Sequence, residues 1–181
     1  YCVVFIGLGV AFIQNNGFIS RFSPNSIKAL NLDKDTDFYR SYLWDRFLNL
    51  KNKRYDNKKS NILIIGDSYS ADLINAFYEV GYNEIFNFTT FQIPKPCGNI
   101  FSDKDLLNYI EIKHKKECKS LKGYKSKYLI DLIKTSNIVI LSSNWENWQL
   151  QFIPETISNL QKITKAKLIV LGSKSFGNIN V

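Results

Sequence analysis

The segment ILIIGDSYSADL, residues 62–73, decides how the rest of the chain is interpreted. Its first four residues are apolar and mostly β-branched, which is typical of a buried parallel strand. Gly66-Asp67-Ser68 interrupts this run, and apolar residues then recur at helical spacing through residue 77. We therefore expect Ser68 to lie on a strand-to-helix turn.

A serine on such a turn has two properties that acyl transfer requires. The hydroxyl of Ser68 would be exposed at the end of the strand, as a nucleophile must be. Its backbone N–H would lie at a helix N-terminus, where developing negative charge is stabilised. The structural alternative is that Asp67 or Ser68 only caps the helix. The spacing alone leaves both interpretations open.

Composition limits the classes of function. The chain has 181 residues, of which 45% are hydrophobic, so it can bury the core of one domain and carry an appendage. The formal net charge is +8. The lysines are scattered, however, and the densest basic run, within residues 51–59, is expected to be a solvated linker. The chain has no nucleic-acid-binding motif, and we expect no nucleic acid partner.

The three cysteines and the single histidine make a zinc site an unattractive interpretation, and we predict no metal. Cys2 lies in an apolar segment. Cys97 and Cys118 flank a polar stretch and could close a loop of about 20 residues. They are expected to form a disulfide if the domain lies outside the cytoplasm, and to be ordinary thiols if it is cytosolic.

Three regions are expected along the chain. Residues 1–13 are uncharged but too few to span a bilayer alone, so we expect them to end a longer transmembrane helix. The alternative is a buried element of a soluble domain. Residues 14–60 are expected to be a linker with one helix, which begins at Asp35 or Thr36. Residues 61–181 are expected to form an α/β domain.

In this third region, short apolar runs alternate with amphipathic segments, which predicts a parallel sheet with right-handed crossovers. The predicted strands are residues 62–65, 84–89, 137–141 and 167–171. The predicted helices are residues 70–80, 103–120, 125–135 and 154–164. Residues 91–101 contain two prolines and a glycine and are predicted to be a loop.

Active sites of open parallel sheets form at the carboxyl ends of the strands. Ser68 follows the first predicted strand, and Asn144 follows the third. The amide of Asn144 could therefore serve as an oxyanion donor above Ser68, or it could form only a turn or a helix cap. Trp145 and Trp148 could line a substrate groove, or simply pack at the edge of the sheet.

Taken together, these segments resemble the SGNH hydrolase family, and in particular the extracytoplasmic SGNH domain fused to acyltransferase-3 membrane proteins. The features that carry the resemblance are the apolar first segment, GFISRF at residues 17–22, GDSYS at 66–70, Cys97 after Pro96 with Cys118, and LSSNW at 141–145. They extend over nearly the whole chain. The resemblance implies a three-layer, flavodoxin-like α/β domain outside the cytoplasm, in which Cys97 and Cys118 form a disulfide.

The resemblance also implies roles for individual residues. Ser68 would be the catalytic nucleophile that carries the acyl group. The oxyanion hole would comprise the Ser68 N–H, an asparagine matched best by Asn144, and a glycine for which Gly98 is a weak match. The Gly-x-Asn-Asp context usual in the family is absent around Asn144.

The largest departure concerns the base. The family supplies it from an Asp-x-x-His segment after the last strand, and this chain has none. Glu111 and His114 have similar spacing, but they occur early in the chain among lysines, where a solvated helix face is the better interpretation. We therefore expect the sequence to be a fragment, with the catalytic Asp and His lying beyond Val181. By itself, this fragment would be inactive.

The leading functional hypothesis is a membrane O-acyltransferase of a bacterial inner membrane, with the SGNH-like domain in the periplasm. A membrane domain of the same chain would use a donor such as acetyl-CoA, and no cofactor would bind here. Ser68 would pass the acyl group, expected to be acetyl, to a hydroxyl of a cell-surface polysaccharide or lipopolysaccharide. One alternative is a carbohydrate esterase or deacetylase with the same serine ester. Another is a catalytically inactive glycan-binding domain.

Overall fold

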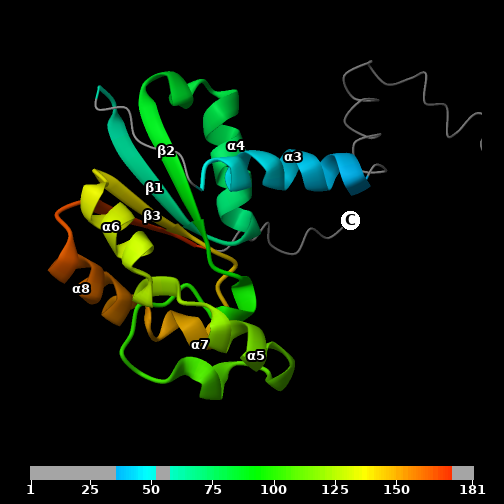
Figure 1. Ribbon diagram of the computed structural model, residues 1–181, viewed down its shortest axis with the longest axis vertical. Coiled ribbons are helices and arrows are strands. Elements are labelled where there is room, and N and C mark those ends of the chain that lie inside the picture. Colours follow the sequence, from blue (N-terminus) through cyan, green and yellow to red (C-terminus); the bar gives the residue numbers. More distant parts are fainter. Residues whose placement is uncertain (1–35, 52–57, 173–181) are drawn as a thin grey trace, which may run out of the picture. The chain divides into compact units, whose positions relative to one another are not determined.

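A computed structural model describes residues 36–51 and 58–172 of the chain (Figure 1). The chain divides into two compact units, residues 1–42 and 43–181. The boundary falls within the first described helix, α3 (Thr36–Asn49). The predictions for residues 1–13, for most of the linker and for residues after 172 lie outside the described residues.

All described strands belong to one parallel sheet in the second unit. They are β1 (Ser60–Gly66), β2 (Phe86–Gln92), β3 (Ile138–Ser142) and β4 (Lys167–Leu171). Their order across the sheet is β2-β1-β3-β4, and each neighbouring pair is parallel. The predicted α/β class and the four parallel strands are thus confirmed.

Helices connect the strands and cover both faces of the sheet (Figure 1). The α-helices after α3 are α4 (Ser68–Glu79), α5 (Ile112–Ser120), α6 (Lys127–Thr135), α7 (Asn147–Leu150) and α8 (Ile153–Ile163). Short 3-10 turns occupy Tyr82–Glu84, Lys95–Cys97, Leu106–Tyr109 and Gly123–Lys125.

The sheet separates two hydrophobic clusters because successive strand residues point to opposite faces. Leu63 and Ile65 of β1 pack on one face, with Leu129 and Ile133 of α6 and Leu160 of α8. The other face buries its own set, with contributions from α3, α4 and three strands: Leu43, Phe47, Leu50, Ile62, Ile64, Ala71, Ile74, Phe88 and Ile140. This burial explains why β1 is apolar at every position from 62 to 65.

Some predicted boundaries were wrong. The second strand begins at Phe86 and continues to Gln92, because a left-handed Gly81 and a 3-10 turn occupy the residues before it. The single helix expected over 103–120 is a 3-10 turn followed by α5. The Asp105 carboxylate accepts a hydrogen bond from the Leu107 N–H and begins that turn. The short helix α7 was not predicted.

A disulfide joins Cys97, in the loop after β2, to Cys118 of α5. It confirms the predicted pairing and attaches the segment before α6 to the carboxyl edge of the sheet. In the part of the chain that the structure describes, no helix is both long enough and apolar enough to cross a membrane.

Candidate active site

The sheet reverses its strand order between β1 and β3. The chain leaves β1 toward β2 on one side and returns to place β3 on the other. At such a switch point the connections after the two central strands diverge, and ligands of open α/β sheets bind in the crevice between them. Ser68 follows β1 and Asn144 follows β3. The topology therefore brings together the two segments that carry the candidate nucleophile and oxyanion donor.

Gly66 permits the ends of β1 and β3 to approach closely. A Cβ atom at this position would lie 1.9 Å from the Ser142 carbonyl oxygen, so no residue with a side chain fits without movement of the backbone. The Ser70 hydroxyl donates to the same carbonyl oxygen at 2.6 Å. The first turn of α4 is thereby attached to the end of β3.

Asp67 connects the loops after the two strands. Its carboxylate caps α4 by accepting from the Tyr69 N–H at 3.0 Å, and it accepts from the Asn144 N–H at 2.9 Å. Only 5% of the residue is exposed. Burial raises the pKa of Asp67 above its usual value, although these N–H groups and the charge of Lys95 oppose the shift. Asp67 therefore holds the backbone of Asn144 beside the start of α4.

The Ser68 and Asn144 side chains have no hydrogen-bond partner among the described residues, and both are half-buried rather than sealed in the core. Ser68 is the first residue of α4, so its N–H is one of the donors that a helix leaves unpaired. The carboxyl edge at the switch point thus carries a hydroxyl, a helix N-terminal N–H and a side-chain amide that form no hydrogen bond with a described residue. They are the groups for which the sequence predicts the roles of nucleophile and oxyanion donors.

Asn99 is a supporting residue that the sequence did not reveal. Its Nδ2 donates to the Ile65 carbonyl at 2.9 Å and to the Ser143 hydroxyl at 3.1 Å. Its Oδ1 accepts from the Tyr124 hydroxyl at 2.7 Å. Burial raises the pKa of Tyr124, which therefore remains a neutral donor. One side chain thus joins the ends of β1 and β3 to the segment before α6.

Gly98 lies in the same loop, but its N–H already donates to the Lys95 carbonyl at 3.2 Å. Its φ of 75° is left-handed, and a Cβ atom here would come within 2.6 Å of the Trp148 ring. The residue therefore has a local reason to be glycine. We leave it out of the proposed oxyanion hole because its donor is engaged in the turn.

The two candidate groove tryptophans have different environments. Trp145 is 8% exposed, packs in the core and donates its Nε1–H to the Leu171 carbonyl at 2.6 Å. This matches the packing alternative. Trp148 is half-buried, stacks on Tyr109 and donates to the Glu146 carboxylate at 2.8 Å. Of the two, Trp148 is the more exposed residue.

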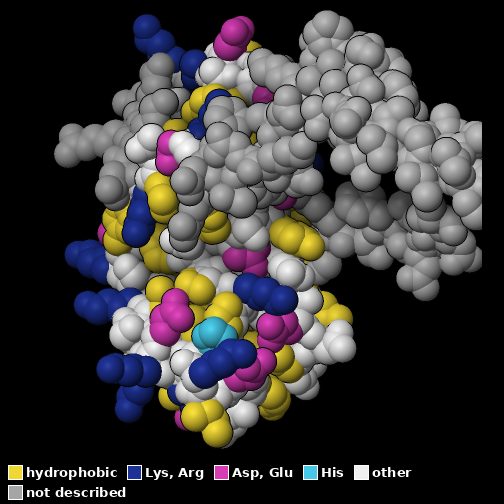
Figure 2. Space-filling view, turned by 90° about the vertical axis from the view of Figure 1, so that its right-hand side faces the viewer, with side chains coloured by type: hydrophobic (Ala, Val, Ile, Leu, Met, Phe, Trp, Pro, Cys, Tyr) yellow, Lys and Arg dark blue, Asp and Glu magenta, His cyan; other side chains and the backbone are white. Residues whose placement is uncertain are grey.

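The only histidine makes no described contact with Ser68. His114 lies on α5, where its Nδ1 is 3.9 Å from the Glu117 carboxylate. Glu111 instead forms an ion pair with Lys113 at 2.7 Å. Figure 2 shows the histidine among lysine and acidic side chains on the surface, as expected for a solvated helix face. In residues 36–51 and 58–172, no base contacts the Ser68 hydroxyl, and no three His, Cys, Asp or Glu residues cluster as metal ligands do.

No family model, curated protein or solved structure matches this chain. The candidate site is therefore defined by its own geometry.

Proposed function

We propose that this chain is part of a membrane O-acyltransferase that carries an acyl group, expected to be acetyl, as an ester on Ser68. The acceptor is a hydroxyl of a cell-surface polysaccharide or lipopolysaccharide. The observation that carries the proposal is the switch point, where Asp67 holds the backbone of Asn144 beside the start of α4, and the Ser68 hydroxyl and the Asn144 amide have no hydrogen-bond partner among the described residues.

The chemistry would proceed in two steps. The Ser68 Oγ forms a bond to the acyl carbon while the bond from that carbon to the donor breaks, and a base passes the hydroxyl proton to the departing donor group. The oxygen of the acceptor sugar then forms a bond to the acyl carbon and gives its proton to the base. The bond from that carbon to the Ser68 Oγ breaks, and the base returns the proton to Oγ, which restores the Ser68 hydroxyl. In both steps negative charge develops on the carbonyl oxygen, where the Ser68 N–H and the Asn144 amide would donate to it.

The disulfide between Cys97 and Cys118 supports an extracytoplasmic location for this chemistry, since disulfides persist in oxidising compartments. In the periplasm, the acceptor glycan and an acyl group delivered by a membrane domain would both be accessible. The resemblance to acyltransferase-3 proteins supplies that domain as a partner in the same chain.

The test is Ser68→Ala in the native protein in its own cell, with O-acyl content of the surface glycan as the measurement. The transferase proposal expects the acyl content to fall to background. A matched control, Ser120→Ala, alters an exposed serine whose hydroxyl only contacts its own helix and should leave the acyl content unchanged. Unchanged acyl content in Ser68→Ala would overturn the proposal, and an increase would indicate an esterase.

A second candidate function is glycan binding without catalysis. The observation that favours it is the lack of any base in contact with Ser68 among the described residues. An unassisted serine hydroxyl is a weak nucleophile. This alternative expects Ser68→Ala to change neither the acyl content nor the affinity for glycan, so the same variant separates it from the transferase.

A further inference from the structure

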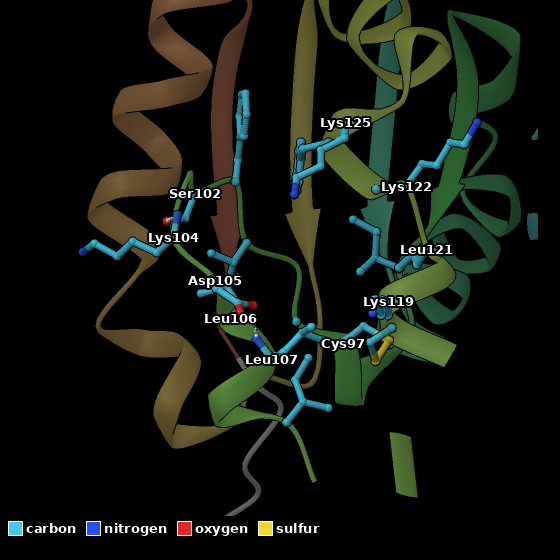
Figure 3. Close-up of a pocket in the computed structure, with 18 of the residues that line it drawn as sticks. Cys97, Ser102, Lys104, Asp105, Leu106, Leu107, Lys119, Leu121, Lys122 and Lys125 are labelled. Atoms are coloured by element: carbon cyan, nitrogen blue, oxygen red, sulfur yellow. Dashed lines mark hydrogen bonds between the residues drawn. A yellow bond between two sulfur atoms is a disulfide. The ribbon is translucent and has the colours of Figure 1, made fainter. Parts of the chain in front are cut away.

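A pocket of about 530 Å³ lies beside the disulfide, in the segment that connects β2 to α6 (Figure 3). Its volume is in the range of small-molecule sites. One side is the loop that follows β2, including Ile93 and Gly98. That loop also carries Asn99, which binds the carboxyl ends of β1 and β3. The pocket therefore adjoins the candidate active site through a shared loop.

The two long walls of the pocket have different charge. The wall of residues 119–125 contains Lys119, Lys122 and Lys125 and no acidic residue. None of these three ammonium groups forms an ion pair with a described residue. In Figure 3, Lys125 extends toward the space between the walls, Lys119 lies beside the disulfide, and Lys122 points outward. This wall offers cations to an anionic group.

The opposite wall, residues 101–107, combines apolar residues with polar and acidic ones. It contains Asp103 and Asp105, whose carboxylates can accept hydrogen bonds from hydroxyl groups. Its cation, Lys104, points outward and is paired with Glu155 at 3.1 Å. Carboxylates on this wall would repel a ligand that is anionic on every side. A ligand with a negative group at one end and hydroxyls at the other suits both walls.

Apolar side chains also line the pocket, among them Ile100 and one leucine from each wall, Leu106 and Leu121. Such a surface packs against the C–H face of a pyranose ring. We propose that this pocket binds an acidic sugar residue of the acceptor glycan, with its carboxylate toward Lys125 and its hydroxyls toward Asp103 and Asp105. This inference rests on the proposed function, because it names the substrate class of that site.

The experiment measures binding of galacturonic acid trisaccharide to the purified chain by titration calorimetry. Its methyl ester has the same rings and hydroxyls but no charge, and serves as the matched ligand. We expect the acid to bind and the ester to bind at least about tenfold more weakly, because a charge-assisted hydrogen bond is lost. Equal affinity for acid and ester would overturn the inference.

Variants locate the site. Lys125→Gln should weaken binding of the acid about tenfold, and Lys122→Gln should have a smaller effect because its side chain points outward. Lys134→Gln on α6 removes the same charge outside the pocket and should leave the affinity unchanged. Equal losses for Lys125→Gln and Lys134→Gln would show non-specific attraction to a basic protein and contradict a site here.

The outcome is separable from the test of the reaction. Ser68→Ala should bind the trisaccharide as tightly as the unmodified chain, since Ser68 does not line the pocket. Failure of the acyl-transfer test would change the reaction assigned to Ser68, whereas failure of the titration would remove only the pocket. The melting temperatures of the three lysine variants should agree with that of the unmodified chain, because Lys122, Lys125 and Lys134 make no described ion pair.

Discussion

The two edges of the sheet both carry asparagines, but they use them differently. At the amino edge, Asn61 accepts from the Asn87 amide and donates to the Thr135 carbonyl, while Asn137 accepts from the Asn61 N–H. Each of these side chains joins one strand end to another, at exposed or half-buried positions. Their amides are engaged in structure, and no described residue at this edge forms the arrangement of an acyl-transfer site.

At the carboxyl edge the structural and the unengaged groups are separate residues. Asn99 and Asp67 are almost fully buried and hold the loops together. Ser68 and Asn144, which those contacts position, have side chains without described partners. The comparison indicates that a candidate site is recognised by polar groups that are held in place by others and are not themselves engaged.

The largest expected effect concerns the close approach of β1 and β3. Gly66→Ala should lower the free energy of unfolding by about 4 kcal/mol or more, because its Cβ would overlap the Ser142 carbonyl. Gly81→Ala is the matched control at the other end of α4. It is left-handed at φ 80° with open space around it, so the cost should be about 1 kcal/mol. Urea unfolding measures both free energies. Equal losses of stability in the two variants would contradict the expectation that Gly66, and not Gly81, lies in a close contact between strands.

The next effect is on the reaction. Asn144→Ala should slow acyl transfer by about 10²–10³-fold, since it removes one oxyanion donor. The backbone N–H that binds Asp67 remains, so the unfolding midpoint should hardly change. Asn137→Ala removes an amide from the amino edge instead and should leave the rate of acyl transfer unaltered. If both variants react at the normal rate, Asn144 is not an oxyanion donor.

A third effect compares two asparagines that hold strands. Asn99→Ala should destabilise the fold by about 3 kcal/mol, because it removes three buried hydrogen bonds and leaves the Tyr124 hydroxyl buried without its acceptor. Asn87→Ala should cost about 1 kcal/mol or less, since water can replace the amide at a half-buried position. Thermal denaturation followed by circular dichroism tests the ranking, and a larger loss for Asn87→Ala would reverse it.

The smallest effect is one of pH. Because burial raises the pKa of Asp67 in the folded chain, the fold favours the protonated carboxyl more than the unfolded chain does. This contribution to stability is present at low pH and is lost as the pH rises through the raised pKa of Asp67. The difference in unfolding free energy between the unmodified chain and Asp67→Asn should therefore decrease above about pH 4. The difference in unfolding free energy between the unmodified chain and Asn61→Ala should be independent of pH. If the difference for Asp67→Asn were also independent of pH, the expectation would be contradicted.

Local periodicity predicted much of the fold. The apolar run of residues 62–65, the spacing after Ser70 and the alternation of strands with helices were sufficient for the α/β class and the four parallel strands. The boundaries failed between residues 81 and 120, where the chain forms 3-10 turns. These turns depend on single caps and on a left-handed glycine, which hydrophobic periodicity does not report.

The candidate site was less accessible to sequence reasoning. Ser68 and Asn144 were identified because each follows an apolar strand, but Asn99 was not, because it is in a loop with no such signal. Trp145 could not be assigned to groove or core from its position alone. Its burial depends on contact with β4, which is far away in sequence.

The amino-acid sequence by itself determined the local elements: the strand and turn that present Ser68, and the helix that begins there. The tertiary structure decided which of these elements meet. The order β2-β1-β3-β4 places Asn144 beside Asp67, the residue before Ser68, and Asp67 and Asn99 connect segments that are far apart in the sequence. The physical reason is that periodicity encodes which face of an element is buried, whereas strand order follows from non-local packing.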